Sequence, residues 1–108
     1  MNQYFNPQPK GKRIVSKPLR DAAKGQSCTL RMPWCNGNDE TTVHCHVRAF
    51  GLSGIGHKPQ DIHGYHGCSE CHRRELDAGF EDILRAVFLT QIRLIQDGII
   101  TVKGDKNN

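Results

Sequence analysis

The stretch CSECHRREL, residues 68–76, places two cysteines two residues apart and a histidine directly after the second. A CxxC turn can present both thiolates to one tetrahedral ion, and a second, looser pair, Cys28 and Cys35, can complete a four-cysteine zinc site. Four thiolates leave no coordination position for water, so we expect this zinc to be structural. It would supply folding energy to a chain of 108 residues of which only 36% are apolar.

The alternative for Cys68 and Cys71 is a redox pair of the thioredoxin type, but the sequence around them lacks the strand-then-helix context of such a pair. Five cysteines leave Cys45 over. This residue lies on the apolar face of a predicted strand, where we expect a buried small hydrophobe. Because four cysteines satisfy the zinc, His72 is left for a separate centre.

The net charge of +4 is concentrated near the N-terminus. Residues 1–24 contain six Lys or Arg and one Asp, a balance of +5, whereas the other nine basic and ten acidic residues give −1. Such a segment can neutralise nucleic-acid phosphates, although a solvated tail has the same composition. No apolar run is long enough for a membrane span or a signal peptide, so we expect the protein in the cytoplasm, where metal thiolates are favoured over disulfides.

The length predicts one domain, at residues 14–103, between a mobile basic N-terminal arm at 1–13 and a tail at 104–108. The segment SKPLRDAAKG predicts a helix, in which Ser16 caps the start and Gly25 ends it in a left-handed turn. Residues 28–40 predict an irregular knuckle, and a further helix is expected to begin near Cys71 and to break at Gly79.

TTVHCHV, residues 41–47, is the best strand candidate because it is short and β-branched. Alternation places one set of side chains on the inner face and another on the outer face, Val43, Cys45 and Val47 against His44, His46 and Arg48. A second strand is expected within DIHGYHG, residues 61–67, after a glycine-rich loop, and IITVKG, residues 99–104, predicts a third.

The longest periodic segment predicts a C-terminal amphipathic helix that ends at Gly98. Its expected buried stripe is Phe80, Ile83, Leu84, Val87, Phe88, Ile92 and Ile95. Leu89 and Leu94 fall outside this stripe, which indicates either a wider buried face or the contact of a homodimer.

A strand carrying His46, a glycine-rich connection with Asp61, and CxxCH opening a helix follow the order of the ββα-metal, or HNH (His-Me finger), nuclease motif. The sequence here resembles the YbcO-like nuclease family of phages and prophages over roughly residues 12–103. The matching residues are Cys28, CNGN at 35–38, the T-T-V-x-C-H-x-R pattern at 41–48, GHKPQD at 56–61 and CSECH at 68–72.

The resemblance implies a small α+β protein with a ββα-metal core, stapled by zinc on Cys28, Cys35, Cys68 and Cys71 and flanked by the C-terminal helix. It implies a DNA endonuclease, in the cytoplasm of a bacterial host, that hydrolyses phosphodiester bonds, with RNA as an alternative partner. His46 would be the general base that activates water, and His72 would bind a catalytic divalent cation such as Mg²⁺. Asp61 would orient His46 or shape the loop.

The sequence departs from the fuller HNH pattern at the residue before the base, where many such enzymes have an Asp or His ligand and this chain has Cys45. His44, on the same strand face as the base, and Glu75, one helical turn after His72, are the two candidates for the second ligand. Phosphate contacts would come from Arg48, Lys58, Arg73 and Arg74, for which solvated surface charge is the alternative.

Two functions other than catalysis are compatible with these residues. A non-catalytic, zinc-stapled nucleic-acid-binding module of phage origin would use the basic arm with Arg73 and Arg74, and it would not need paired imidazoles. An interaction domain with a purely structural zinc would need neither of the two histidines His46 and His72. The histidine cluster favours the enzyme.

Overall fold

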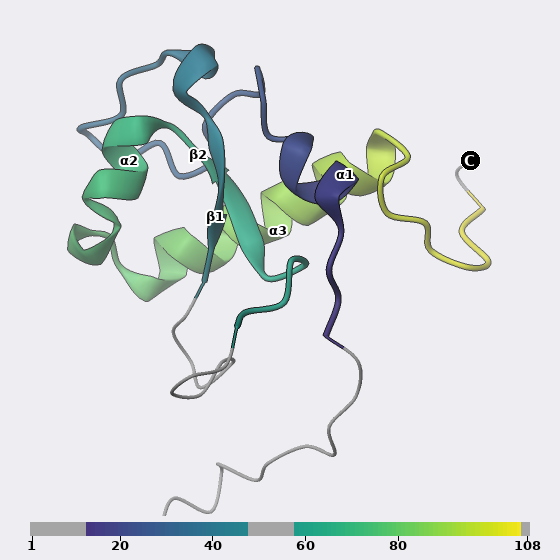
Figure 1. The fold of residues 1–108 in the computed structure, drawn as a ribbon. Coiled ribbons are helices and arrows are strands. Elements are labelled where there is room, and N and C mark those ends of the chain that lie inside the picture. Colours follow the sequence, from purple (N-terminus) through teal and green to yellow (C-terminus); the bar gives the residue numbers. More distant parts are fainter. Residues whose placement is uncertain (1–12, 48–57, 107–108) are drawn as a thin grey trace, which may run out of the picture.

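The structure is a computed structural model that describes residues 13–47 and 58–106. In chain order these residues form α1 (Lys17–Asp21), a 3-10 turn (Asp39–Thr41), β1 (Val43–His46), β2 (Gly64–Gly67), α2 (Ser69–Arg73), a second 3-10 turn (Glu75–Asp77) and α3 (Phe80–Gln96). The strands pair antiparallel, α3 packs across β2, and α1 contacts β1 (Figure 1). The α+β class is confirmed. None of the helices in these ranges is long and apolar enough to cross a membrane.

The first helix forms for the reasons that the sequence indicates. Ser16 is the N-cap, and its hydroxyl oxygen accepts a hydrogen bond of 3.2 Å from the backbone N–H of Leu19. Pro18 lies in the first turn, where no N–H is required. After a short series of turns Gly25 has a φ of +77°, a conformation that glycine adopts without strain.

The strand register separates the side chains of the hairpin into two faces. His44 is opposite His66, and Cys45 is opposite Tyr65. Because side chains alternate along a strand, His44, His46 and His66 share one face of the hairpin, which we call the imidazole face. Cys45 and Tyr65 share the other face. Gly64 belongs to the imidazole face, where a Cβ would collide with the His44 ring.

The core lies on the Cys45 side of the hairpin and includes metal-binding candidates. Its buried members are Cys28, Leu30, Cys45, Val47, Tyr65, Cys68, Cys71, Ala86 and Val87. The inward orientation of Cys45 and Val47 is therefore confirmed. The same expectation was wrong for Val43, which is 44% exposed at the start of β1.

The predicted buried stripe of α3 was wrong for most of its members. Phe80, Leu84, Phe88 and Ile92 are exposed, and so is Leu89, whereas the buried residues of α3 are Ala86, Val87, Thr90 and Leu94. Apolar spacing alone missed this face because α3 is oriented by a polar contact: the Thr90 hydroxyl accepts a hydrogen bond of 2.9 Å from the backbone N–H of His66. The small side chain of Ala86 allows the close approach.

Two further expectations need correction. The helix after β2 begins at Ser69, close to the predicted start near Cys71, and has Cys68 as its N-cap. The CxxC pair therefore does follow a strand and open a helix, contrary to the expectation that this context is lacking. Within residues 97–106 no strand forms: the chain turns at Gly98, whose φ is +76°, and the N–H groups of Ile99 and Ile100 both donate to Leu94 O.

Candidate active site and metal centre

A histidine and a buried carboxylate form the centre of the imidazole face. His46 Nε2 lies 2.8 Å from Asp61 Oδ1. The His46 side chain is 26% exposed, whereas that of Asp61 is 1% exposed. The pair thus consists of a carboxylate held inside the protein and an imidazole that solvent reaches.

Asp61 is fixed by several contacts besides His46. The backbone N–H of Ser16 donates to Oδ2 at 2.7 Å, and Arg20 Nη1 lies 3.6 Å from the same oxygen. Burial alone would raise the pKa of Asp61, but the Ser16 and His46 hydrogen bonds and the Arg20 charge outweigh it and leave the pKa below its usual value. Asp61 is therefore ionised at neutral pH.

An ionised carboxylate only accepts hydrogen bonds, so neutral His46 carries its proton on Nε2. Its lone pair is then on Nδ1, the nitrogen that does not face Asp61. This is the arrangement in which an aspartate orients a histidine as a base and stabilises the imidazolium that forms.

Two further histidines pack beside the pair. The His44 ring lies 4.9 Å from that of His46 and 6.3 Å from that of His66, measured between ring centroids. His44 Nε2 donates to the backbone oxygen of Asp61 at 2.8 Å, so both the backbone and the side chain of Asp61 hold histidines of β1. Burial is the main cause that lowers the pKa of His44.

His66 is completely buried, and Arg93 Nη1 donates to its Nδ1 at 2.9 Å. Burial, followed by the Arg93 charge, lowers the pKa of His66 to about 4. The same guanidinium donates to the carbonyl and the hydroxyl of Ser27, at 2.9 and 2.8 Å. His66 is therefore a neutral residue that supports the hairpin.

The four cysteines singled out in the sequence meet at one point, with all four sulfur atoms within 4.8 Å of one another. Four thiolates about 2.3 Å from a tetrahedral ion are separated by roughly 3.8 Å. The Sγ atoms of Cys35 and Cys68 are 3.8 Å apart. The cluster can hold a metal ion, and its chemistry and spacing fit zinc. Among the described residues, it is the only group of three or more His, Cys, Asp or Glu side chains whose ligand atoms lie this close together.

Local backbone geometry directs these sulfurs inward. Arg31 has a left-handed φ of 51°, which turns its N–H towards Cys28 Sγ at 3.5 Å. On the second arm, the N–H of Cys71 points to Cys68 Sγ at 3.4 Å. Burial would raise the pKa of Cys68, but the N–H groups of Cys71 and Asn36 lower it to about 7.

Cys45 does not belong to this cluster. It is 1% exposed, and burial raises the pKa of its thiol to about 12. The expectation of a small buried hydrophobe is confirmed.

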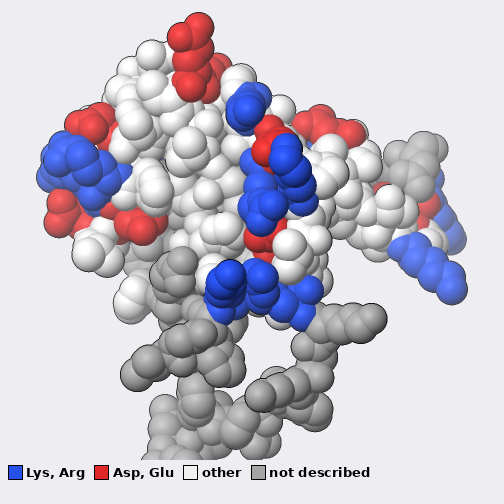
Figure 2. Space-filling view, viewed as in Figure 1, with Lys and Arg blue, Asp and Glu red and all other residues white. Residues whose placement is uncertain are grey.

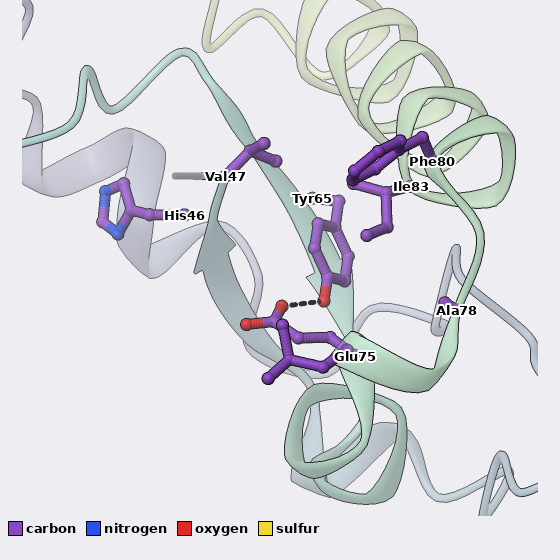
Figure 3. Close-up of a pocket in the computed structure, with 8 residues that line it drawn as sticks. His46, Val47, Tyr65, Glu75, Ala78, Phe80 and Ile83 are labelled. Carbon is purple, nitrogen blue, oxygen red and sulfur yellow. Dashed lines mark hydrogen bonds between the residues drawn. The ribbon is translucent and has the colours of Figure 1, made fainter. Parts of the chain in front are cut away.

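Among the described residues, the two candidate ligands from the segment after β2 make no hydrogen bond or ring contact with His44 or His46. Glu75 accepts a hydrogen bond of 2.5 Å from the Tyr65 hydroxyl, and the His46 ring points away from both (Figure 3). His72 is exposed on α2, and within residues 13–47 and 58–106 no side-chain hydrogen bond, ion pair or ring contact joins it to His44 or His46.

An apolar cavity of about 360 Å³ lies between the end of β1 and the start of α3. Its lining residues are His46, Val47, Tyr65, Glu75, Leu76, Ala78, Phe80 and Ile83 (Figure 3). His46 borders it while its ring faces away, so the cavity and the His46–Asp61 pair lie on opposite sides of β1.

The four candidate phosphate contacts differ in whether an acidic side chain already pairs with them. Arg73 donates to both carboxylate oxygens of Glu70, at 3.0 and 2.9 Å. Arg74 bonds Asp77 at 3.1 Å, and its guanidinium lies 4.2 Å from the centroid of the Trp34 ring. Lys58 is exposed, and Arg48 lies outside the described residues. Figure 2 shows the basic atoms over α2 flanked by acidic ones, and further basic atoms gathered over α1.

Ser16 and Arg20 are the site residues that sequence reasoning missed. They bind Asp61 across about 40 to 45 positions of sequence. The basic character of residues 1–24 was a signal for Arg20, but nothing in the sequence connects α1 with the loop before β2. His66 and Arg93 were missed as partners for the same reason.

Comparisons with known proteins cover most of this site. A family model described as "Putative nuclease YbcO" matches residues 17–94. Two proteins, "Putative nuclease YbcO" of Escherichia coli K12 and "Putative nuclease ybcO" of Enterobacteria phage 82, are each 43% identical over 91 residues, covering 76% of this chain and 95% of the relative. A solved structure titled "Structure of a putative bacteriophage protein from Escherichia coli str. K-12 substr. MG1655" is 33% identical, with a TM-score of 0.60, and covers 75% of this chain and 100% of its own. The chain belongs to the YbcO nuclease family.

Proposed function

We propose that the protein is an HNH-type endonuclease that hydrolyses phosphodiester bonds in DNA, with His46 as the general base. The observation that carries the proposal is the hydrogen bond of 2.8 Å between His46 Nε2 and the buried Asp61. The nuclease names of the relatives support nucleic acid as the class of substrate.

In this mechanism His46 Nδ1 takes a proton from water as the water oxygen attacks phosphorus. Asp61 remains ionised and stabilises the imidazolium. The bond to the 3′ oxygen breaks, and that oxygen leaves with the electron pair and is then protonated. Arg20, which pairs with Asp61 from α1 and is 41% exposed, is a further candidate for phosphate contact. Lys58 and Arg48 remain proposed phosphate contacts.

Two metal ions complete the proposal. The four-cysteine cluster would hold a structural zinc. A separate divalent cation, such as Mg²⁺, would neutralise charge on the phosphate in the transition state and is proposed to use His72 as a protein ligand. Such ions are commonly held by one or two protein ligands together with waters and substrate phosphates, so the proposal requires few protein ligands. His44 is bonded to the Asp61 backbone and Glu75 to Tyr65, so each would have to give up a hydrogen bond to bind the ion.

The test is nicking of supercoiled plasmid by full-length, zinc-loaded protein in the presence of Mg²⁺, Mn²⁺ or Ni²⁺. We expect His46→Ala to lower the nicking rate by about 100-fold or more, because general bases contribute about 10² to 10⁴ in rate. His63→Ala is the matched control from the same region. Zinc content by elemental analysis should stay at one per chain in both variants.

Plasmid that remains intact with every ion would remove the catalytic claim. Retained DNA binding by that inactive protein and by His46→Ala alike would favour the binding module instead. His72→Ala separates the two metal roles: a ligand of the second ion predicts a higher ion requirement at unchanged zinc content. An unchanged requirement would exclude His72.

A further inference from the structure

The outer face of α3 carries a row of large apolar side chains that are partly exposed to solvent. Phe80, Leu84, Phe88 and Ile92 follow one another at four-residue spacing, with exposed fractions of 64, 38, 60 and 54%. Leu89 lies beside them and is 51% exposed. These five residues are called the α3 ridge. Exposed apolar surface of this kind in a small protein marks an interaction site.

We propose that the α3 ridge is the contact surface of a homodimer in which two copies of this chain pack their α3 helices antiparallel. The proposal is independent of the catalytic one, since the ridge contains none of the residues assigned to the active site.

The geometry of the ridge favours a second copy as its occupant. Side chains at four-residue spacing form a ridge inclined to the helix axis, and two identical ridges of this kind interdigitate in the commonest class of helix packing. A dimer with two-fold symmetry requires a surface that complements itself, and this spacing provides one. Antiparallel packing also places the oppositely charged ends of the two helix dipoles together.

The balance of charges on α3 favours a second copy of the chain over nucleic acid as the binding partner of the α3 ridge. The helix contains two acidic residues, Glu81 and Asp82, and two basic residues, Arg85 and Arg93. Asp82 and Arg85 already form an ion pair of 2.7 Å, and Arg93 is bonded to Ser27 and His66. The face therefore has neither the excess of positive charge that phosphates require nor a net charge that would repel a second copy.

The available area suits a dimer of ordinary size. With about 200 Å² for a large apolar side chain, five that are about half exposed present on the order of 500 Å². A stable interface buries about 800 Å² on each partner, with a polar rim around an apolar centre. The polar side chains beside the ridge can supply the remainder.

A second feature extends the surface at its N-terminal end. Phe80 belongs both to the ridge and to the lining of the 360 Å³ cavity, whose other members include Leu76, which is 97% exposed. An antiparallel pairing centred between Leu84 and Phe88 brings Ile92 of the second copy opposite Phe80, at this cavity. The cavity at this end of the α3 ridge can therefore receive the Ile92 side chain of the second copy, as a knob fits into a hole between packed helices.

Sedimentation velocity of the full-length, zinc-loaded protein up to about 100 μM tests the proposal. We expect a mass twice that of the 12.2 kDa chain. Phe88→Glu should weaken the dimer by about 30-fold or more, the effect of losing one central hot spot. Val15→Glu is the matched control, because Val15 is also apolar and 55% exposed but precedes α1.

Zinc content and circular dichroism show whether each variant folds, and Ile92→Glu provides the same test if Phe88→Glu does not. A wild-type protein that stays monomeric at the highest concentration overturns the proposal. So does a dimer that neither substitution weakens. A monomer that loses DNA binding on Phe88→Glu would assign the face to nucleic acid and overturn it as well.

Discussion

His44, His46 and His66 are the same kind of side chain on one face of one hairpin, and their surroundings give them different properties. His66 is fully buried and accepts a hydrogen bond from a cation, so it stays neutral. His44 donates to a backbone carbonyl and is largely removed from solvent. His46 alone combines a carboxylate partner with partial exposure. The neighbours of each ring, rather than the number of histidines, distinguish His46 as the candidate base.

His44 predicts a dependence of stability on pH. Its folded-state pKa lies below the ordinary value of 6.5, so between the two values the unfolded chain binds a proton that the folded chain does not. The free energy of unfolding therefore falls as pH decreases below about 6.5, by at most about 1.4 kcal/mol for each unit of pKa difference. Urea unfolding at pH 7 and pH 5.5 should show a smaller change for His44→Gln, whose amide can keep the bond to Asp61.

Zinc must be measured at each pH, because protonation of thiolates releases metal from both proteins alike. An equal change in unfolding free energy for wild type and His44→Gln would contradict the assignment.

At the scale of elements, α3 shows what periodicity predicts and what it does not. Its location and its end at Gly98 followed from the sequence, since apolar residues at helical spacing and a terminal glycine are local signals. Its buried face did not, because Ala86 and Thr90 count for little in an apolar pattern. Their small size and the Thr90 hydroxyl decide which side meets β2. Exposure of the more apolar side is the basis of the proposed dimer.

Thr90→Val is expected to reduce stability by about 1 to 3 kcal/mol, although it adds an apolar methyl group in place of the hydroxyl. The reason is that the buried N–H of His66 loses its acceptor, and the Thr29 hydroxyl at 3.3 Å loses a neighbour. Thermal unfolding compared with Thr90→Ser, which keeps the hydroxyl, isolates the hydrogen bond. Equal stability of the Val and Ser variants would show that packing, not this bond, orients α3.

For the whole molecule, the cysteine cluster joins the knuckle to the start of α2, beside hydrogen bonds such as that of 2.9 Å from Asn36 Nδ2 to Ser69 Oγ. Cys28 and Cys35 belong to an irregular knuckle, and Cys68 and Cys71 to the start of α2. Spacing made these four residues predictable, because a CxxC turn is a local signal and few pairs can complete it. The contacts of Asp61 with Ser16 and Arg20 were not predictable, because they depend on how α1 returns to the hairpin.

Metal removal is therefore expected to unfold the protein. Structural zinc in small domains contributes apparent free energies of about 10 to 16 kcal/mol, more than the total stability of most domains. Cys71→Ser should abolish stoichiometric zinc binding and the cooperative thermal transition. Cys45→Ser, a change of the same chemistry at a buried thiol outside the cluster, should keep one zinc and a single transition. A folded, metal-free Cys71→Ser protein would show that the core suffices without the ion.

Trp34 is the single tryptophan of the chain. It precedes Cys35 in the sequence and stacks under the Arg74 guanidinium, so its fluorescence reports on the surroundings of the cysteine cluster. The indole packs against the core that contains the sulfur cluster. Loss of a metal ion from the cluster is expected to separate the knuckle from α2 and Trp34 from Arg74. The tryptophan emission spectrum should therefore report whether the cysteines hold an ion, without any attached dye.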